Sequence, residues 1–317
     1  MKTPLTYYGG KQSLSKKIVK LMPEHRIYVE PFLGGGAVFW AKAPSPLEVL
    51  NDTNGEIVNF YEVLRNDFDA LNNEIQSSLH SLEQHRRARV IYENSFMFDK
   101  IKCAWAVWML ANCSYGSILD GSFGYNLSGA YECKLDAKRK NFVMDMSGRL
   151  QKTQIERSDA LRVIRSRDTL ETFLYIDPPY VGADQGHYDG YAQKDFDALL
   201  GTLDNLKGKF MLSSYRNKSL AEHGKKNGWH TVELRRANAM TSKKPGVRRK
   251  EKTKCLTANY HIWLERAVGR IFQTGAIGAL GSPFLPGLYF RRKSVRCRER
   301  LDLRVQSGGG FSITRIR

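Results

Sequence analysis

The sequence has few cysteines, and no two of them have the short spacing of a CxxC motif. Five cysteines occur among 317 residues, an odd number, and no two form a CxxC pair. Disulfide frameworks and structural zinc sites both use cysteines at paired spacings, so the composition argues against either. We expect reduced thiols in a cytosolic protein without a bound metal ion, at Cys103, Cys113, Cys133, Cys255 and Cys297.

Long hydrophobic runs are also missing. No apolar stretch reaches the ~20 residues that a membrane-spanning helix needs, and the N-terminus has no signal-peptide pattern. No basic helix carries the clean apolar face that binds a membrane surface. With 42% hydrophobic residues the chain can still form a core, so we expect a cytoplasmic globular protein. Its oligomeric state stays open between a monomer and a weak dimer.

Acidic residues are too few to balance the basic ones. The chain has 50 Lys and Arg against 32 Asp and Glu, a net charge of +18, which favours a nucleic acid as partner. Part of the excess lies between Arg235 and Lys254, where a loop with Pro245 and Gly246 has nine basic residues and one Glu. A solvated charge run is the competing interpretation. We predict phosphate contacts from Lys243, Lys244, Arg248 and Arg249.

The chain begins and continues as an alternating α/β protein. Apolar strands are predicted at 27–30 and 47–52, each followed by a helical pattern, and this is how a doubly wound parallel sheet starts. The alternation resumes after about residue 154 with strands at 173–176 and 209–215 and intervening helices. Two further strands flank the basic loop and predict a terminal antiparallel hairpin.

Two other parts differ from this alternation. Residues 68–153 begin with two helical patterns and continue with a stretch rich in Gly, Ser, Asn and aromatics, which predicts loops or a hairpin. We interpret them as an inserted, mostly helical domain between 1–67 and 154–265. Residues 266–317 contain ten Arg, one Lys and two acids. This basic appendage is interpreted as a nucleic-acid-binding arm, a disordered tail or a non-native extension.

The segment FLYIDPPYVG, residues 173–182, combines a buried strand with a rigid turn. Its prolines end the strand because they have no N–H to donate to the sheet. Asp177, Pro178, Pro179 and Tyr180 therefore place a carboxylate and a phenol in fixed relation at the end of a core strand. Asp184, His187 and Asp189 follow in a Gly-rich loop, but their spacing defines no metal site.

Two N-terminal segments suggest a nucleotide-like cofactor. VEPFLGGGAVF contains the spacing Phe32-x-Gly34-x-Gly36, which is typical of S-adenosylmethionine (AdoMet) sites, although an ordinary tight turn has the same glycines. Asp52 follows the next strand and is placed either to bind ribose hydroxyls or to cap the following helix. LTYYGGKQSL, with Tyr7 and Lys11, precedes a helix, and Lys11 could bind a carboxylate.

Together these segments resemble the Dam-type DNA adenine-N6 methyltransferases of the alpha group. The resemblance covers about residues 3–264 and rests on six segments in that family's order: YYGGK, VEPFLGGGAVFW, LEVLNDTN, SDALRVI, YIDPPY and LTANY. Tyr7 stands where such enzymes often have tryptophan. The resemblance implies a Rossmann-like seven-stranded sheet, AdoMet as cofactor, double-stranded DNA as substrate and a target-recognition domain in residues 68–153.

The resemblance also implies roles for individual residues. Cofactor binding falls to Tyr7, Lys11, Phe32, Gly34, Gly36, Asp52, Asp159 and Asp177. Catalysis on a flipped-out adenine falls to Asp177, Pro178, Pro179 and Tyr180. Contacts to bases are predicted for Ser117, Asp120, Ser122, Tyr125 and Asn126.

Other functions remain compatible with the sequence. Cytosine-N4 transfer uses similar acceptors, but those enzymes usually have Ser in place of Asp177, and RNA adenine methylation uses related motifs. A DNA-binding module without catalysis is an alternative of another class. The sequence leaves open the recognition sequence, a partner restriction enzyme and a phage or cellular origin.

Overall fold

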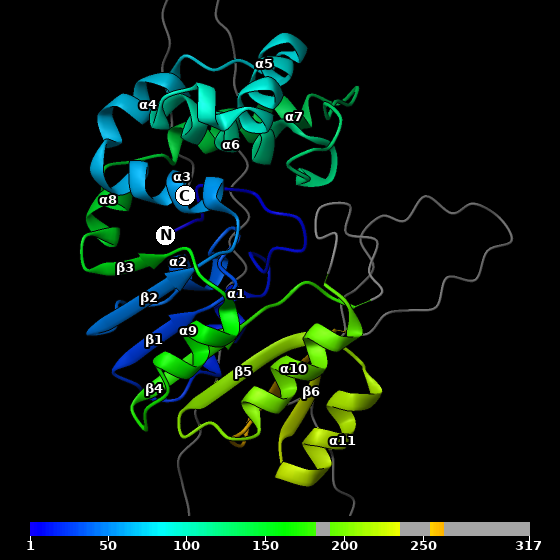
Figure 1. Ribbon diagram of the computed structural model, residues 1–317. Coiled ribbons are helices and arrows are strands. Elements are labelled where there is room, and N and C mark those ends of the chain that lie inside the picture. The colour runs from blue at the N-terminus through cyan, green and yellow to red at the C-terminus, as the bar shows by residue number, and fades with distance from the viewer. Residues whose placement is uncertain (182–190, 235–253, 263–317) are drawn as a thin grey trace, which may run out of the picture. The chain divides into compact units, whose positions relative to one another are not determined.

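A computed structural model describes residues 1–181, 191–234 and 254–262 of the chain (Figure 1). Several predicted residues lie outside these ranges and stay predictions. They are Lys243, Lys244, Arg248 and Arg249 of the basic loop, Asp184, His187 and Asp189, and the appendage 266–317.

The centre of the fold is a seven-stranded sheet with the strand order β3-β2-β1-β4-β5-β7-β6. The strands β1 (Ile27–Glu30), β2 (Leu47–Asn51), β3 (Thr153–Glu156), β4 (Thr172–Ile176) and β5 (Lys209–Tyr215) are parallel. The pair β6 (His230–Leu234) and β7 (Lys254–Ala258) is antiparallel and closes one edge. The predicted doubly wound sheet and its terminal hairpin are confirmed.

Alternating side chains along the strands form a core on each face of the sheet. In β4, Phe173 and Tyr175 face one core, whereas Leu174 and Ile176 face the other. The second core is covered by three helices: α9 (Ala160–Ser166), α10 (Gln193–Leu203) and α11 (Lys218–Asn227). The first core is covered by α1 (Ser15–Lys20), α2 (Ala37–Ala41) and α3 (Gly55–Asn66). Because both faces are covered, β4 is buried along its whole length.

Residues 68–150 form a helical layer that packs on α3 (Figure 1). It contains α4 (Phe68–Gln76), α5 (Leu82–Glu93), η1 (Ser95–Met97), α6 (Lys100–Cys113), η2 (Tyr115–Ser117), α7 (Ala130–Lys140) and α8 (Asp145–Leu150). Helix α6 is its centre, since every residue from Cys103 to Cys113 is buried. The layer shares one continuous hydrophobic core with the first face of the sheet.

One part of the helical layer differs from the prediction. Loops or a hairpin were expected throughout the polar stretch after α6, but α7 occupies Ala130–Lys140. Its apolar signal is weak because Leu135 is the single fully buried residue of this helix. None of the helices in the described ranges is long and apolar enough to cross a membrane.

Candidate active site

A cavity of about 830 Å³ opens at the carboxyl ends of the parallel strands. Parallel sheets bind ligands at this edge because the connecting loops diverge there. All eight cofactor-binding residues and all four catalytic residues of the prediction line this one cavity. They come from segments up to 173 residues apart, Tyr7 to Tyr180, so the fold brings the predicted set together.

The glycine-rich turn after β1 forms one wall. Gly34 and Gly36 have φ angles of +47° and +59°, in the left-handed region that favours glycine. A Cβ on Gly34 would lie 2.9 Å from the Tyr7 ring. The absence of side chains here therefore lets Tyr7 pack directly on the turn, and both segments border the cavity.

Asp52 is tied to this turn. One carboxylate oxygen accepts the Gly34 N–H at 2.8 Å and the other accepts the Asn54 N–H at 2.9 Å. Burial raises the pKa of Asp52, while these backbone donors oppose that shift. The proposed capping role is wrong, because Asn54 caps α3 through the Glu56 N–H. Asp52 also borders the cavity.

Lys11 and Asp177 form an ion pair in the wall of the cavity. The ammonium nitrogen lies 2.6 and 2.5 Å from the two carboxylate oxygens and also donates to the Gly9 carbonyl at 3.1 Å. Lys11 is buried, whereas Asp177 is 18% exposed and borders the cavity. The lysine thus holds the carboxylate that follows β4 in one orientation.

Tyr180 is held by Asp177, which follows β4, and by Ser213 of β5. Its hydroxyl lies 2.7 Å from the Ser213 hydroxyl and donates to an Asp177 oxygen at 3.2 Å. Burial, together with the nearby Asp177 charge, raises the pKa of Tyr180. Tyr215 contacts the ring edge-to-face at a centroid distance of 4.6 Å. Both phenol rings stay neutral and line the cavity.

Phe32 and Asp159 occupy other parts of the wall. The Phe32 ring meets Tyr191 edge-to-face at 6.4 Å, and the buried Tyr191 hydroxyl has no hydrogen-bond partner among the described residues. Asp159 caps α9 by accepting the Arg162 N–H at 2.9 Å. An unpaired buried hydroxyl costs roughly 1–3 kcal/mol, so a ligand with a polar atom beside Tyr191 would remove that cost.

The residues predicted to read bases are only partly at the cavity. Ser117 lines it with Ile118 and Leu119, whereas the other four do not. Asn126 accepts the Ala130 N–H at 3.1 Å, at the start of α7. Tyr125 is 74% exposed. Base contacts by Asp120, Ser122, Tyr125 and Asn126 stay predictions.

Several cavity residues were not predicted from the sequence. Tyr215 ends β5, beside the end of β4, and the adjacent strand ends were a usable signal for it. Lys254 begins β7 and places its ammonium 5.6 Å from the centre of the Tyr180 ring. Glu30 ends β1 and accepts the Tyr28 hydroxyl at 2.7 Å. Nothing in the sequence pattern marks the Glu30 side chain as part of a site, so Glu30 is not among the predicted residues.

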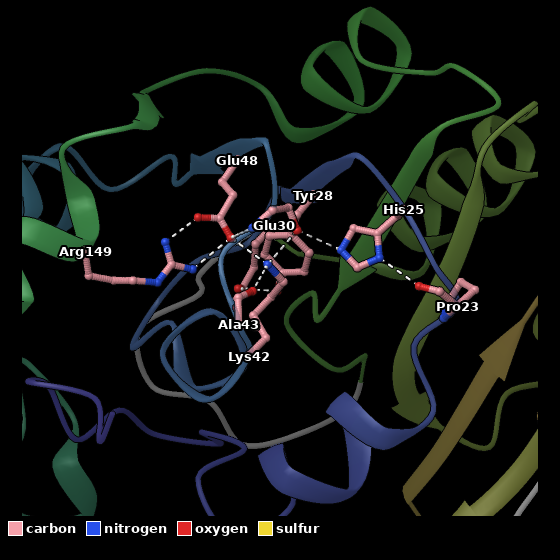
Figure 2. Close-up of polar contacts among 9 residues, drawn as sticks. Pro23, His25, Tyr28, Glu30, Lys42, Ala43, Glu48 and Arg149 are labelled. Atoms are coloured by element: carbon pink, nitrogen blue, oxygen red, sulfur yellow. Dashed lines mark hydrogen bonds and ion pairs between the residues drawn. The ribbon is translucent and has the colours of Figure 1, made fainter.

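A second polar cluster lies on the first-core face of the sheet, near the beginnings of β1 and β2 (Figure 2). Lys42 lies 2.5 Å from Glu48, and Arg149 of α8 contacts both oxygens of the same carboxylate. The Lys42 ammonium also sits 4.4 Å from the centre of the Tyr28 ring. This buried cluster joins the helical layer to β2, and Tyr28 connects it to Glu30.

Comparisons with known proteins agree with this geometry. A type II methyltransferase of Lactococcus lactis subsp. cremoris is 25% identical over 272 residues, covering 80% of this chain and 93% of that protein. A type II methyltransferase of Methanocaldococcus jannaschii is 24% identical, covering 67% and 84%. A DNA adenine methylase of Vibrio cholerae is 24% identical, covering 69% and 77%.

The family comparison covers most of the chain. The model of the D12 class N6 adenine-specific DNA methyltransferases matches residues 7–238. This description names DNA and the N6 position, so it favours adenine-N6 transfer over cytosine-N4 transfer, an RNA substrate or a non-catalytic module. The matched range contains the glycine-rich turn, the Lys11–Asp177 pair and Tyr180, and the chain belongs to the D12 class N6 adenine-specific DNA methyltransferase family.

Proposed function

We propose that the cavity binds AdoMet beside a flipped-out adenine and that Asp177 directs methyl transfer to the adenine N6 amine. The observation that carries the proposal is the position of the Asp177 carboxylate. It follows β4, is fixed by Lys11 and Tyr180, and borders the same cavity as the glycine-rich turn.

The residues of the cavity fit AdoMet. The carboxylates of Asp52 and Asp177 offer partners for a cation and for ribose hydroxyls, and Lys11 offers one for a carboxylate. The glycine-rich turn has no side chain at Gly34, so its backbone can border a ligand. The Tyr191 hydroxyl, which has no hydrogen-bond partner among the described residues, offers a further donor. Phe32 and Asp159 would border the adenine of the cofactor. A volume of about 830 Å³ leaves room for a base as well.

The main contribution of the protein to methyl transfer would be to position the adenine N6 amine and the methyl donor. When bound, AdoMet supplies a methyl group on a sulfonium, which is already a good leaving group. The adenine N6 amine is a poor nucleophile because its lone pair is delocalised into the ring. Asp177 and the Pro178 carbonyl would accept its two N–H groups, which favours an sp³ nitrogen with its lone pair directed at the methyl group. The two prolines keep these acceptors in fixed relation.

The target amine is paired inside duplex DNA, so the base must leave the stack. We assign the Tyr180 ring as its stacking surface, with Tyr215 and Lys254 beside it. Residues 68–153 are proposed as the target-recognition domain, whose loop after α6 reaches the cavity through Ser117. The protein would act on double-stranded DNA in the cytoplasm, and the basic loop 235–254 would bind phosphates.

The test is product identification with a matched control. The protein is incubated with unmethylated DNA and AdoMet, the DNA is digested to nucleosides, and methylated nucleosides are identified by mass. We expect N6-methyladenine from the wild type and from Asp168→Ala, whose carboxylate binds backbone N–H groups at the opposite end of β4. Asp177→Ala should give none. N4-methylcytosine, or equal product from Asp177→Ala, would refute the proposal.

A further inference from the structure

A short loop at the edge of the cavity has an unusual backbone. Residues 114–124, the recognition loop, close on themselves through a bridge between Ser114 and Phe123 and through the Tyr115 N–H, which donates to the Ser122 carbonyl at 2.7 Å. Gly116 and Ser117 have φ angles of +67° and +57°. Ser117 is the one non-glycine residue with positive φ in the described ranges. Such a conformation persists only where the surroundings enforce it.

Helix α5 supplies that enforcement at the tip of the loop. The Arg89 guanidinium donates to the backbone carbonyls of both Asp120 and Gly121. Both bonds come from one terminal nitrogen, whose two hydrogens lie in the guanidinium plane and hold the two carbonyls in fixed relation. A freely rotating ammonium does so in a less defined way. These carbonyls directly follow the Ser117–Leu119 segment that lines the cavity.

Two histidines hold the ends of the loop. His85, one turn before Arg89 on α5, lies 2.9 Å from the Ser114 hydroxyl. His80 stacks on the Phe123 ring at 4.5 Å and lies 2.9 Å from the Gly124 carbonyl. Both ends and the tip of the recognition loop are therefore fastened to α5 and to the residues just before it.

The same helix reaches the cofactor side of the cavity. Tyr92, three residues after Arg89, lines the cavity and accepts a hydrogen bond from the Asn54 side chain at 2.9 Å. Asn54 in turn binds Asp52 through its backbone N–H. Helix α5 thus contacts both the recognition loop and the wall beside Asp52.

We infer that Arg89 is a positioning residue for target recognition, which sets the conformation of the recognition loop without touching the reacting atoms. The inference rests on the proposed function, in which this loop meets the target DNA. The Arg89 guanidinium donates to backbone carbonyls of the protein. Removal of Arg89 would therefore act on target DNA through the conformation of the loop. The expected consequence is a loss of affinity and selectivity for the target sequence with cofactor binding retained.

The experiment compares Arg89→Met, Arg89→Lys and Arg87→Met in the full-length protein. Arg87 lies exposed on the same helix, so Arg87→Met removes one charge without touching the loop. The target sequence is first mapped with the wild type. Then kcat and KM are measured on that sequence and on versions with one base changed, AdoMet affinity is measured by calorimetry, and Tm is recorded.

We expect Arg89→Met to raise KM for DNA between about 10- and 100-fold and to reduce discrimination against altered sites. AdoMet affinity should stay within about twofold, and Arg89→Lys should restore part of the loss because an ammonium keeps the charge and N–H donors but not their planar arrangement. Arg87→Met should change KM for all sequences alike. KM and selectivity equal to those of the wild type, or an equal loss of AdoMet affinity, would overturn the inference. If the wild type makes no N6-methyladenine, the proposed function fails instead.

Discussion

Two ion pairs in this protein are built from the same parts. Lys11 pairs with Asp177 at 2.5 Å and lies 5.0 Å from the Tyr180 ring centre. Lys42 pairs with Glu48 at 2.5 Å and lies 4.4 Å from the Tyr28 ring centre. Each is a lysine between a carboxylate and a tyrosine face, at the sheet.

The surroundings separate the two pairs. Asp177 is 18% exposed and borders the cavity, whereas the Glu48 side chain is 3% exposed and also binds Arg149. A carboxylate closed in by two cations has no capacity for a substrate, but one that borders a cavity does. Access to solvent, and not the ion pair itself, therefore separates a structural carboxylate from one that can meet a substrate.

The largest expected effect is on stability at the buried pair. Glu48→Gln removes the negative charge between Lys42 and Arg149 and leaves two buried cations uncompensated. We expect a loss of about 3–5 kcal/mol in the free energy of unfolding, measured by urea denaturation. The exposed pair Arg26–Glu171 is the control, since Glu171→Gln should cost less than about 1 kcal/mol. Equal costs would contradict the distinction.

Asp177→Asn should show the opposite pattern. The amide keeps the shape and one acceptor but loses the charge, so methyl transfer should fall on the order of 10²–10³-fold. The free energy of unfolding should fall by less than it does in Glu48→Gln, because one cation instead of two loses its partner and Lys11 borders the cavity. Single-turnover methylation and urea denaturation on the same preparation test both parts. A stability loss as large as that of Glu48→Gln would make Asp177 a structural residue.

Glu30 lies between the two pairs and gives a pH-dependent prediction. Burial raises its pKa to about 8, and the nearby Asp177 charge adds to the shift. In the unfolded chain the group ionises near 4.5, so its stabilising contribution is present below that pH and is lost as pH rises toward 8. Relative to Glu30→Gln, the wild type should lose about 3 kcal/mol of unfolding free energy by pH 7.

Urea denaturation at pH 5, 6, 7 and 8 measures this difference. The gap between Glu30→Gln and the wild type should widen steadily over the series. A gap that is independent of pH would mean that Glu30 titrates normally in the folded protein.

The smallest effect on stability and activity is expected at Tyr180, beside the Lys11–Asp177 pair. Ser213→Ala removes the partner 2.7 Å from the Tyr180 hydroxyl, while the bond to Asp177 remains. We expect a loss of roughly 1 kcal/mol in the free energy of unfolding and a modest fall in kcat/KM. Thermal unfolding and steady-state kinetics measure these changes. No change in either would show that Asp177 alone orients the ring.

Much of the site could be predicted because its residues sit where strands end. Asp177 follows β4, and the glycines that follow β1 adopt positive φ, so short sequence segments carried both signals. Tyr215 could have been found in the same way from the end of β5. The positions of Ser117 and Asn126 could not be predicted in this way, because Ser117 lines the cavity through the path of its loop and Asn126 contacts the start of α7.

The sequence by itself determined the strand and helix periods, the rigid turn at Pro178 and Pro179, and the order of motifs that identifies the family. These are local properties, since they follow from missing N–H groups, missing side chains and alternating apolar residues. Tertiary structure decided that Lys11 meets Asp177, that Lys42 and Arg149 share Glu48, and that Arg89 holds the recognition loop. Ion pairing and burial depend on distances between remote segments, which only the packed chain fixes.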